Sequence, residues 1–342
     1  MKKVVTFGEI MLRLKSPGHE RLFQSPMLEA TFGGGEANVA VSIANFGMRA
    51  AFVGALSKDA VGDAALSALR ARGVDVSSVK RSSQRTGIYF LESGADQRPS
   101  LVVYDRSGSA ASAMAPGDFD WPAILKDADW FHVTGITPAL SRSAADAAIE
   151  AAKAARAAGA KVSVDLNYRK KLWNYGAKAP EVMRELAKLT DVLVANEEDI
   201  QLALGIAAQS DPSKGKVEAE SYRALAERTK AEFPNLGAIA ITLRESKSAD
   251  RNGWSAVLLG TSGFRASRSY QIEDIVDRVG GGDSFAAGLI FGLLEYGDEA
   301  KALEFAVAAS ALKHTIPGDF NLASREEVER LAGGDGSGRV VR

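Results

Sequence analysis

The chain has 342 residues, 46% of them hydrophobic and 25% charged, which is ordinary for a folded globular protein with two domains or one large domain and an appendage. Its 42 Lys and Arg residues nearly balance 43 Asp and Glu residues, and a net charge of −1 argues against nucleic acid or an anionic membrane as the main partner. The lack of cysteine excludes disulfides, thiolate nucleophiles, iron–sulfur clusters and cysteine-ligated zinc, and the three histidines show no metal-binding spacing.

No segment has the pattern of a signal peptide or a membrane span. The apolar run at residues 4–8 is too short for a signal peptide and is followed by Glu9. The longest apolar stretch, residues 285–294, is about half as long as a membrane span. We therefore expect a cytoplasmic protein that does not contact a membrane.

Short apolar runs alternate with segments of helical periodicity along most of the chain. The predicted strands are residues 4–8, 51–55, 129–134, 161–166, 191–195, 237–243 and 254–260. The predicted helices are residues 36–46, 60–72, 141–158, 218–232, 282–294 and 299–313. This alternation predicts an α/β fold with a mostly parallel sheet covered by helices, in which the polar residues 244–253 join the last two strands.

Two stretches, residues 12–31 and 86–118, interrupt the alternation. They have no helical period, and the second contains two β-rich runs separated by a turn. We expect them to form a small β-sheet lid inserted into a main domain. That domain would comprise residues 1–11, 32–85 and 119–331, and the glycine-rich residues 332–342 are expected to be disordered.

The strongest chemical signal lies at residues 277–285, where Gly280, Gly281 and Gly282 lead directly into an apolar helix. Unpaired N–H groups at a helix start favour an anion, and glycines allow a phosphate to approach the backbone. Asp283 follows at once; its carboxylate suits a base that takes a proton from a hydroxyl attacking a phosphoryl group, although it could also simply cap the helix. The P-loop, the dinucleotide fingerprint and the G-x-S-x-G elbow are all absent.

Four segments resemble, in order, the motifs of the ribokinase/PfkB family of carbohydrate kinases: residues 33–38, 165–169, 196–199 and 277–283. The resemblance extends from residue 4 to about residue 331. It implies a three-layer ribokinase-like domain with a mostly parallel central sheet and a small β-sheet lid. It also implies transfer of the γ-phosphoryl group of ATP to a sugar hydroxyl, with Mg²⁺.

The resemblance also implies roles for individual residues. Asp283 would be the general base, and Gly280, Gly281 and Gly282 would form the anion hole. The sugar-binding residues would be Gly33, Gly34, Gly35, Asn38, Tyr89, Tyr104, Arg106, Asn167, Arg169 and Asp319. The ATP-binding residues would be Asn196, Asp199, Thr242, Arg244, Gly280, Gly282 and Lys313, with Asp199 contacting Mg²⁺ through water.

Within the family, residues 8–14, 277–279 and 316–320 resemble members that act on the acid sugar 2-keto-3-deoxygluconate. The guanidinium groups of Arg106 and Arg169 suit the carboxylate of such a substrate. A kinase for a neutral sugar such as fructose or ribose and a non-catalytic sugar-binding protein remain alternatives, whereas the missing dinucleotide fingerprint disfavours an oxidoreductase. The exposed edges of a lid sheet further predict a homo-oligomer, a dimer or larger.

Overall fold

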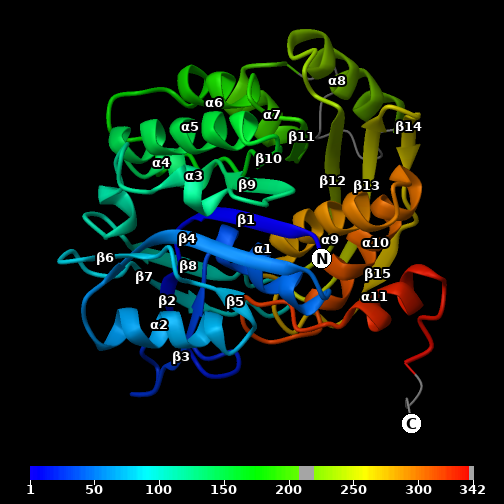
Figure 1. Cartoon of the computed structure of the whole chain (residues 1–342). Helices are drawn as coiled ribbons and strands as arrows, with labels where there is room; N and C mark the ends of the chain where they lie inside the picture. Colours follow the sequence, from blue (N-terminus) through cyan, green and yellow to red (C-terminus); the bar gives the residue numbers. More distant parts are fainter. Residues whose placement is uncertain (208–218, 339–342) are drawn as a thin grey trace.

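The structure is a computed structural model that describes residues 1–207 and 219–338. Within these residues an eleven-stranded sheet runs through the centre, and a separate four-stranded sheet lies beside it. Helices cover both faces of the central sheet: α4, α5 and α6 lie on one side in Figure 1, and α1, α9 and α10 on the other. This arrangement confirms the predicted fold class.

The central sheet follows the order β14-β13-β12-β11-β10-β9-β1-β4-β5, with β15 beside β13 and β6 beside β4. Its strands are β1 (Lys3–Gly8), β4 (Arg49–Ser57), β5 (Val74–Asp75), β6 (Lys80–Ser82), β9 (Trp130–Thr134), β10 (Lys161–Asp165), β11 (Val192–Ala195), β12 (Ala238–Ser246), β13 (Asn252–Gly260), β14 (Gly263–Ala266) and β15 (Tyr270–Ile272). The pairs from β4 to β12 are parallel, and β13 is antiparallel to β12. The carboxyl ends of the parallel strands therefore meet at one edge, where α/β proteins bind ligands.

Each face of the sheet packs against its own layer of helices. The helices are α1 (Gly35–Asn45), α2 (Ala60–Arg70), α3 (Trp121–Ile124), α4 (Ile136–Ala139), α5 (Arg142–Ala157), α6 (Ala179–Ala187), α7 (Glu197–Leu204), α8 (Ala219–Glu232), α9 (Gly281–Glu295), α10 (Glu299–Lys313) and α11 (Arg325–Ala332), with a 3₁₀ turn at Ala111–Ala113. Val4 and Val5 are neighbours on β1 and point into opposite cores. Successive strand residues face opposite sides, so a strand buried on both sides is a continuous apolar run.

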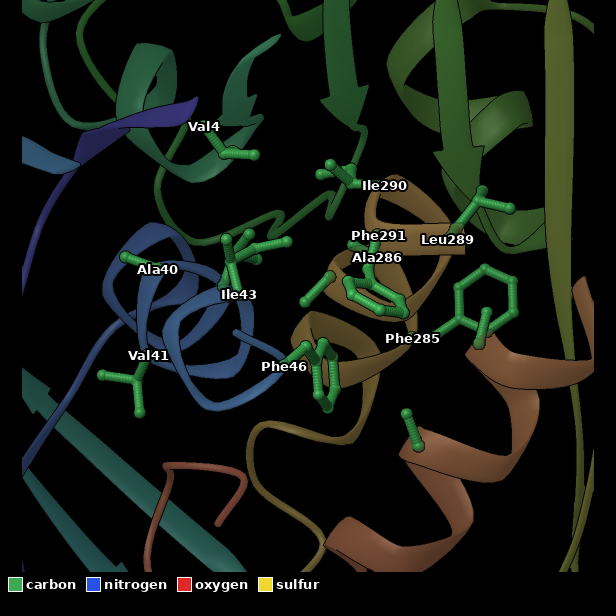
Figure 2. Packing of buried hydrophobic residues seen from close by; sticks show 14 of the residues in the cluster. Val4, Ala40, Val41, Ile43, Phe46, Phe285, Ala286, Leu289, Ile290 and Phe291 are labelled. Atoms are coloured by element: carbon green, nitrogen blue, oxygen red, sulfur yellow. The ribbon is translucent and has the colours of Figure 1, made fainter. Parts of the chain in front are cut away.

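Close packing of α9 places the start of this helix under the ligand-binding edge. Figure 2 shows Phe285, Ala286, Leu289 and Ile290 of α9 in one core with side chains of α1. Gly292 lies against α10, and a Cβ on it would be 2.5 Å from the Cα of Ala302. Glycine is therefore needed here so that the two helix backbones can approach each other.

The four-stranded sheet has the order β3-β2-β7-β8. Its strands are β2 (Met11–Lys15), β3 (Glu29–Gly33), β7 (Ile88–Glu92) and β8 (Leu101–Asp105). The pair β2 and β7 is parallel and the other two pairs are antiparallel. All five residues of the edge strand β8 are exposed.

The structure corrects one local expectation and leaves others partly outside the described residues. Residues 244–253 are not a simple loop, because β12 and β13 continue as a hairpin in which Arg244 pairs with Trp254 and Ser246 with Asn252. Residue 218, at the start of a predicted helix, and residues 339–342 of the predicted disordered tail lie outside the described residues. Ala332, the first residue of that predicted tail, is the last residue of α11. The helices of the described residues are all too short or too polar to cross a membrane.

Candidate active site

A cleft of about 430 Å³ lies at the carboxyl ends of the parallel strands, between the central sheet and the four-stranded sheet. Most of the residues singled out from the sequence line it: Gly34, Gly35, Asn38, Tyr89, Tyr104, Arg106, Asn167, Arg169, Asn196, Thr242, Arg244, Gly280, Gly281, Gly282, Asp283 and Asp319. Gly33, Asp199 and Lys313 do not line it. Segments far apart in the sequence thus converge on one cavity.

The glycine loop before α9 leaves room for a ligand above the helix start. Gly280 has φ 83°, a conformation that favours glycine, and a Cβ there would overlap the carbonyl oxygen of Asp319. By contrast, a Cβ on Gly282 would meet no atom within 4 Å. The N–H groups of Gly282 and Asp283 lie in the first helical turn, where the helix provides no acceptor for them. This geometry suits an anion.

Asp283 lies at the base of the cleft with one clear hydrogen-bond partner. Its Oδ2 accepts a hydrogen bond from Asn38 Nδ2 at 2.7 Å. Burial, with a smaller contribution from the nearby carboxylates of Asp319 and Glu36, raises the pKa of Asp283 to about 7 against the opposing effects of Asn38 and Arg169. A carboxyl group with this pKa can accept a proton near neutral pH.

The first glycine cluster packs around the same point. A Cβ on Gly33 would overlap the Asp319 carboxylate, and one on Gly34 would overlap the carbonyl oxygen of Glu9. The Gly34 N–H donates to Asn38 Oδ1 at 3.2 Å. Asn38 therefore connects the turn before α1 to the carboxylate of Asp283.

Two further carboxylates lie near the ends of β10 and β11. Burial raises the pKa of Asp165 well above its ordinary value, and Asp199 and Asp283 add to the shift. Burial also raises the pKa of Asp199 to about 6. Asp199 has structural partners, because Oδ1 accepts from the Tyr168 N–H at 3.0 Å and its own N–H donates to Asn196 Oδ1 at 2.8 Å, capping α7.

The two arginines selected for a sugar acid have different surroundings. Arg106 is buried, forms an ion pair with Glu9, and its guanidinium carbon lies 5.2 Å from the centre of the Tyr104 ring. Arg169 is exposed, and its Nη1 donates to the Tyr168 carbonyl oxygen at 2.9 Å. Arg169 is consequently the freer of the two to bind an anionic group.

Lys313, which the sequence predicts to be an ATP-binding residue, lies behind the glycine loop. Lys313 is fully buried, and its Nζ donates to the carbonyl oxygens of Asp277 at 3.2 Å and Ile316 at 3.0 Å. Burial lowers its pKa to about 8. The ammonium group thus binds the protein backbone behind the cleft and outside its lining, and the predicted contact with ATP stays a prediction.

Sequence reasoning did not select several residues that the fold brings to this region. Asp165, Trp254, Arg278 and His314 line the cleft. Arg13, on β2, is buried behind it against Asp277 and Asp319. Asp165 opens the 165–169 motif near the end of the predicted strand 161–166 and could have been found from that position. The sequence around Arg13, in contrast, does not indicate which carboxylates it contacts.

The glycine loop and the buried Asp283 in this cleft suit phosphoryl transfer, and comparison with known proteins shows the family of the chain. The model of the pfkB family carbohydrate kinases matches residues 1–323, so the chain belongs to this family. It is 32% identical over 334 residues to a 2-dehydro-3-deoxygalactonokinase from Haloferax volcanii, covering 97% of this chain and 98% of the relative.

Two other proteins are similar over nearly their whole length. A 2-dehydro-3-deoxygluconokinase from Thermoproteus tenax is 32% identical over 335 residues, covering 97% of this chain and 94% of the relative. The crystal structure of a 2-dehydro-3-deoxygluconokinase from Thermotoga maritima has a TM-score of 0.92 and 48% sequence identity, covering 98% of this chain and all of that chain (100%). The family predicted from the sequence motifs is thereby confirmed.

Proposed function

We propose that this carbohydrate kinase transfers the γ-phosphoryl group of ATP to a hydroxyl of 2-keto-3-deoxygluconate, also called 2-dehydro-3-deoxygluconate. The names of the similar proteins from Thermoproteus tenax and Thermotoga maritima support this substrate. The observation that carries the reaction type is the buried Asp283 beside the open glycine loop, which places a base and an anion site together.

In the proposed mechanism Asp283 accepts the proton of the attacking sugar hydroxyl. Asn38 orients its carboxylate through the 2.7 Å hydrogen bond. The N–H groups at the start of α9 and the positive end of the helix dipole stabilise the charge on the transferred phosphoryl oxygens. Preorganised donors of this kind are most effective in a site that excludes water.

ATP would occupy the side of the cleft formed by Asn196, Thr242 and Arg244, with its γ-phosphate at Gly280–Gly282. The described residues contain no group of three His, Asp or Glu side chains able to hold a metal ion. Mg²⁺ is commonly held by one or two carboxylates together with phosphates and water, and the buried Asp165 near Asp199 fits that requirement. Bound Mg²⁺ would neutralise part of the phosphate charge.

The substrate carboxylate would be bound chiefly by Arg169, with Tyr89, Tyr104, Arg106 and Asp319 around the sugar. Arg106 already forms an ion pair with Glu9, which is 2% exposed, so the charge of Arg106 is less available to the substrate. The relative from Haloferax volcanii is named 2-dehydro-3-deoxygalactonokinase, so the epimeric sugar acid 2-keto-3-deoxygalactonate is the second candidate substrate.

A coupled ADP-release assay tests the proposal. The purified protein is given ATP, Mg²⁺ and, in turn, 2-keto-3-deoxygluconate, 2-keto-3-deoxygalactonate, fructose and ribose. We expect kcat/KM to be highest for 2-keto-3-deoxygluconate and at least tenfold lower for the neutral sugars, the effect of one charge-assisted contact of about 1.5 kcal/mol. Equal rates with fructose or ribose would refute the acid-sugar assignment.

The exposed edge strand β8 supports a homo-oligomer. Leu101 and Val103 on this strand are 47% and 45% exposed, and an uncovered apolar edge favours pairing with another chain. Light scattering during gel filtration should give a mass at least twice the 36.1 kDa of one chain. A mass of one chain would contradict the proposal.

A further inference from the structure

Arg13 is a charged residue that the fold buries almost completely. It lies in the middle of β2, opposite Thr31 of β3 and Tyr89 of β7, and its side chain is 1% exposed. Burying an unpaired guanidinium costs much free energy, so a buried arginine needs partners of opposite charge. The partners of Arg13 indicate which segments of the chain it connects.

Its two terminal nitrogens bind carboxylates from two other parts of the chain. Nη1 donates to Asp319 Oδ1 at 2.6 Å, and Nη2 forms an ion pair with Asp277 Oδ2. Tyr89, Arg13's neighbour across the strands, donates from its hydroxyl to the same Asp319 oxygen at 2.6 Å. The four-stranded sheet is therefore fastened to two segments of the α/β domain.

Both carboxylates belong to the support of the glycine loop. Asp277 is the first residue of the loop segment 277–282, and its Oδ1 accepts from the Val279 N–H at 3.1 Å. Its Oδ2 also accepts from the Gly318 N–H at 3.1 Å. The backbone of Asp319 lies directly behind Gly280, where a Cβ would overlap its carbonyl oxygen. A shift of Asp277 or Asp319 would consequently move the N–H groups that face the phosphate.

We propose that Arg13 is a positioning residue that holds the glycine loop, residues 277–282, in register with the sugar side of the cleft. Through Asp319 it shares a partner with Tyr89, and through Asp277 it reaches the backbone of the loop. The inference rests on the proposed function, because it assumes that the sugar and the phosphoryl group meet in this cleft. A planar guanidinium is required, since one ammonium nitrogen cannot reproduce its fork between two carboxylates.

The test compares Arg13→Lys and Arg13→Met with Arg98→Met. Arg98 is the control because it also pairs with a buried carboxylate, Nη1 to Glu92 at 2.6 Å, but lies in the turn between β7 and β8, where its other side-chain hydrogen-bond partner is the His19 carbonyl oxygen. Three quantities are measured: kcat, KM for ATP, and the affinity for ADP with fluoroaluminate and Mg²⁺, which mimics the phosphoryl group in transfer. The midpoint of urea unfolding is recorded for each variant.

For Arg13→Lys we expect kcat to fall about 10- to 100-fold, somewhat less than the loss of a complete oxyanion donor, with KM for ATP within about threefold of wild type. Affinity for the fluoroaluminate complex should fall in the same proportion as kcat. Arg98→Met should leave all three values within about twofold. If Arg13→Met does not fold, the charge-conserving Arg13→Lys decides.

Two outcomes would overturn the inference. One is a kcat of Arg13→Lys within twofold of wild type. The other is a lower kcat with unchanged fluoroaluminate affinity per folded molecule, which would mean that Arg13 only stabilises the fold. The ratios are taken with whichever sugar of the panel the wild type phosphorylates best. If the wild type phosphorylates a neutral sugar but no sugar acid, the proposed substrate is wrong. The role of Arg13 is then tested with that neutral sugar.

Discussion

The chemistry of single residues depends on burial that the cleft imposes on them. Asp283 has the carboxyl group of any aspartate, yet burial raises its pKa to about 7. The groups that shift this pKa come from three separate segments of the chain: Glu36 and Asn38 of α1, Arg169, and Asp319. A residue suited to acid–base work is thus produced by its neighbours and not by its type alone.

Replacement of Asp283 by asparagine tests its role as the base. The amide cannot accept the proton, so we expect kcat to fall about 10²- to 10⁴-fold. KM for the sugar should change less, because the amide keeps a hydrogen-bonding oxygen for Asn38. Steady-state kinetics measure both values, and a kcat within threefold of wild type would show that Asp283 is not the base.

Gly282→Val tests the anion site. A Cβ on Gly282 would meet no atom within 4 Å, so we expect the protein to accommodate valine, whose side chain would occupy the place of the phosphate. We expect a folded protein whose activity is reduced more than 100-fold, since removing a single preorganised donor already costs about 10²- to 10³-fold. Circular dichroism confirms folding, and an active, folded variant would show that the loop is only a turn.

Arg169→Ala tests the choice of substrate class. A charge-assisted hydrogen bond contributes about 1.5–3 kcal/mol, so kcat/KM for the sugar acid should fall about 10- to 100-fold with little change in KM for ATP. Arg169→Lys should recover little, because a point charge cannot bind the carboxylate through two parallel hydrogen bonds. An equal loss with a neutral sugar would argue against a carboxylate contact.

At the scale of elements, the position of the site depends on helices packed at short range. The glycine loop is held at the ligand-binding edge by α9, and α9 is fixed by its contact with α10 at Gly288 and Gly292. In sequence these two glycines weaken the prediction of a helix, because glycine is a poor helix former. In the structure they allow the approach of the helix backbones.

Gly292→Ala should therefore destabilise the protein although alanine favours helices. Its Cβ would lie 2.5 Å from the Cα of Ala302, and overpacking of this kind costs about 1–3 kcal/mol. Gly282→Ala is the matched control, because its Cβ meets no atom within 4 Å. Urea unfolding measures both variants, and equal stability of Gly292→Ala and wild type would refute the packing argument.

At the scale of the whole molecule, the cleft concentrates carboxylates whose charge the fold disfavours. The buried carboxyl groups with a raised pKa are Glu36, Asp165, Asp199, Asp283 and Asp319. When the pKa of a carboxyl group is higher in the folded than in the unfolded protein, ionisation of that group lowers the free energy of unfolding. These groups therefore lower stability as the pH rises through their folded pKa values.

The difference in stability between wild type and Asp283→Asn should depend on pH in a defined direction. The pKa of Asp283 rises from an ordinary 3.8 to about 7 on folding, so its ionisation destabilises the native state progressively between about pH 4 and pH 7. We expect Asp283→Asn to be more stable than wild type at pH 8 and the difference to shrink toward pH 4. A difference that is constant from pH 4 to pH 8 in urea titrations would contradict this account.

The sequence by itself determined the fold class and indicated candidates for the reacting groups. Apolar runs alternating with helical segments specify a parallel sheet covered by helices, because period and burial are local properties. The glycines before Asp283 likewise predict an anion site, because the start of any helix offers unpaired N–H groups. Continuation of β12 and β13 through polar residues 244–253 was not visible locally, since strand pairing and not composition extends the hairpin.

Only the tertiary structure decided which groups are free to act. Arg106 and Arg169 look equivalent in sequence, but Arg106 neutralises Glu9 whereas Arg169 is exposed at the cleft. Lys313 ends a helix near the site in sequence, but its ammonium group binds backbone carbonyls behind the glycine loop. The reason is physical: the partners of a charge are set by contacts between distant segments, and Arg13 meets Asp319 across 306 positions of the chain.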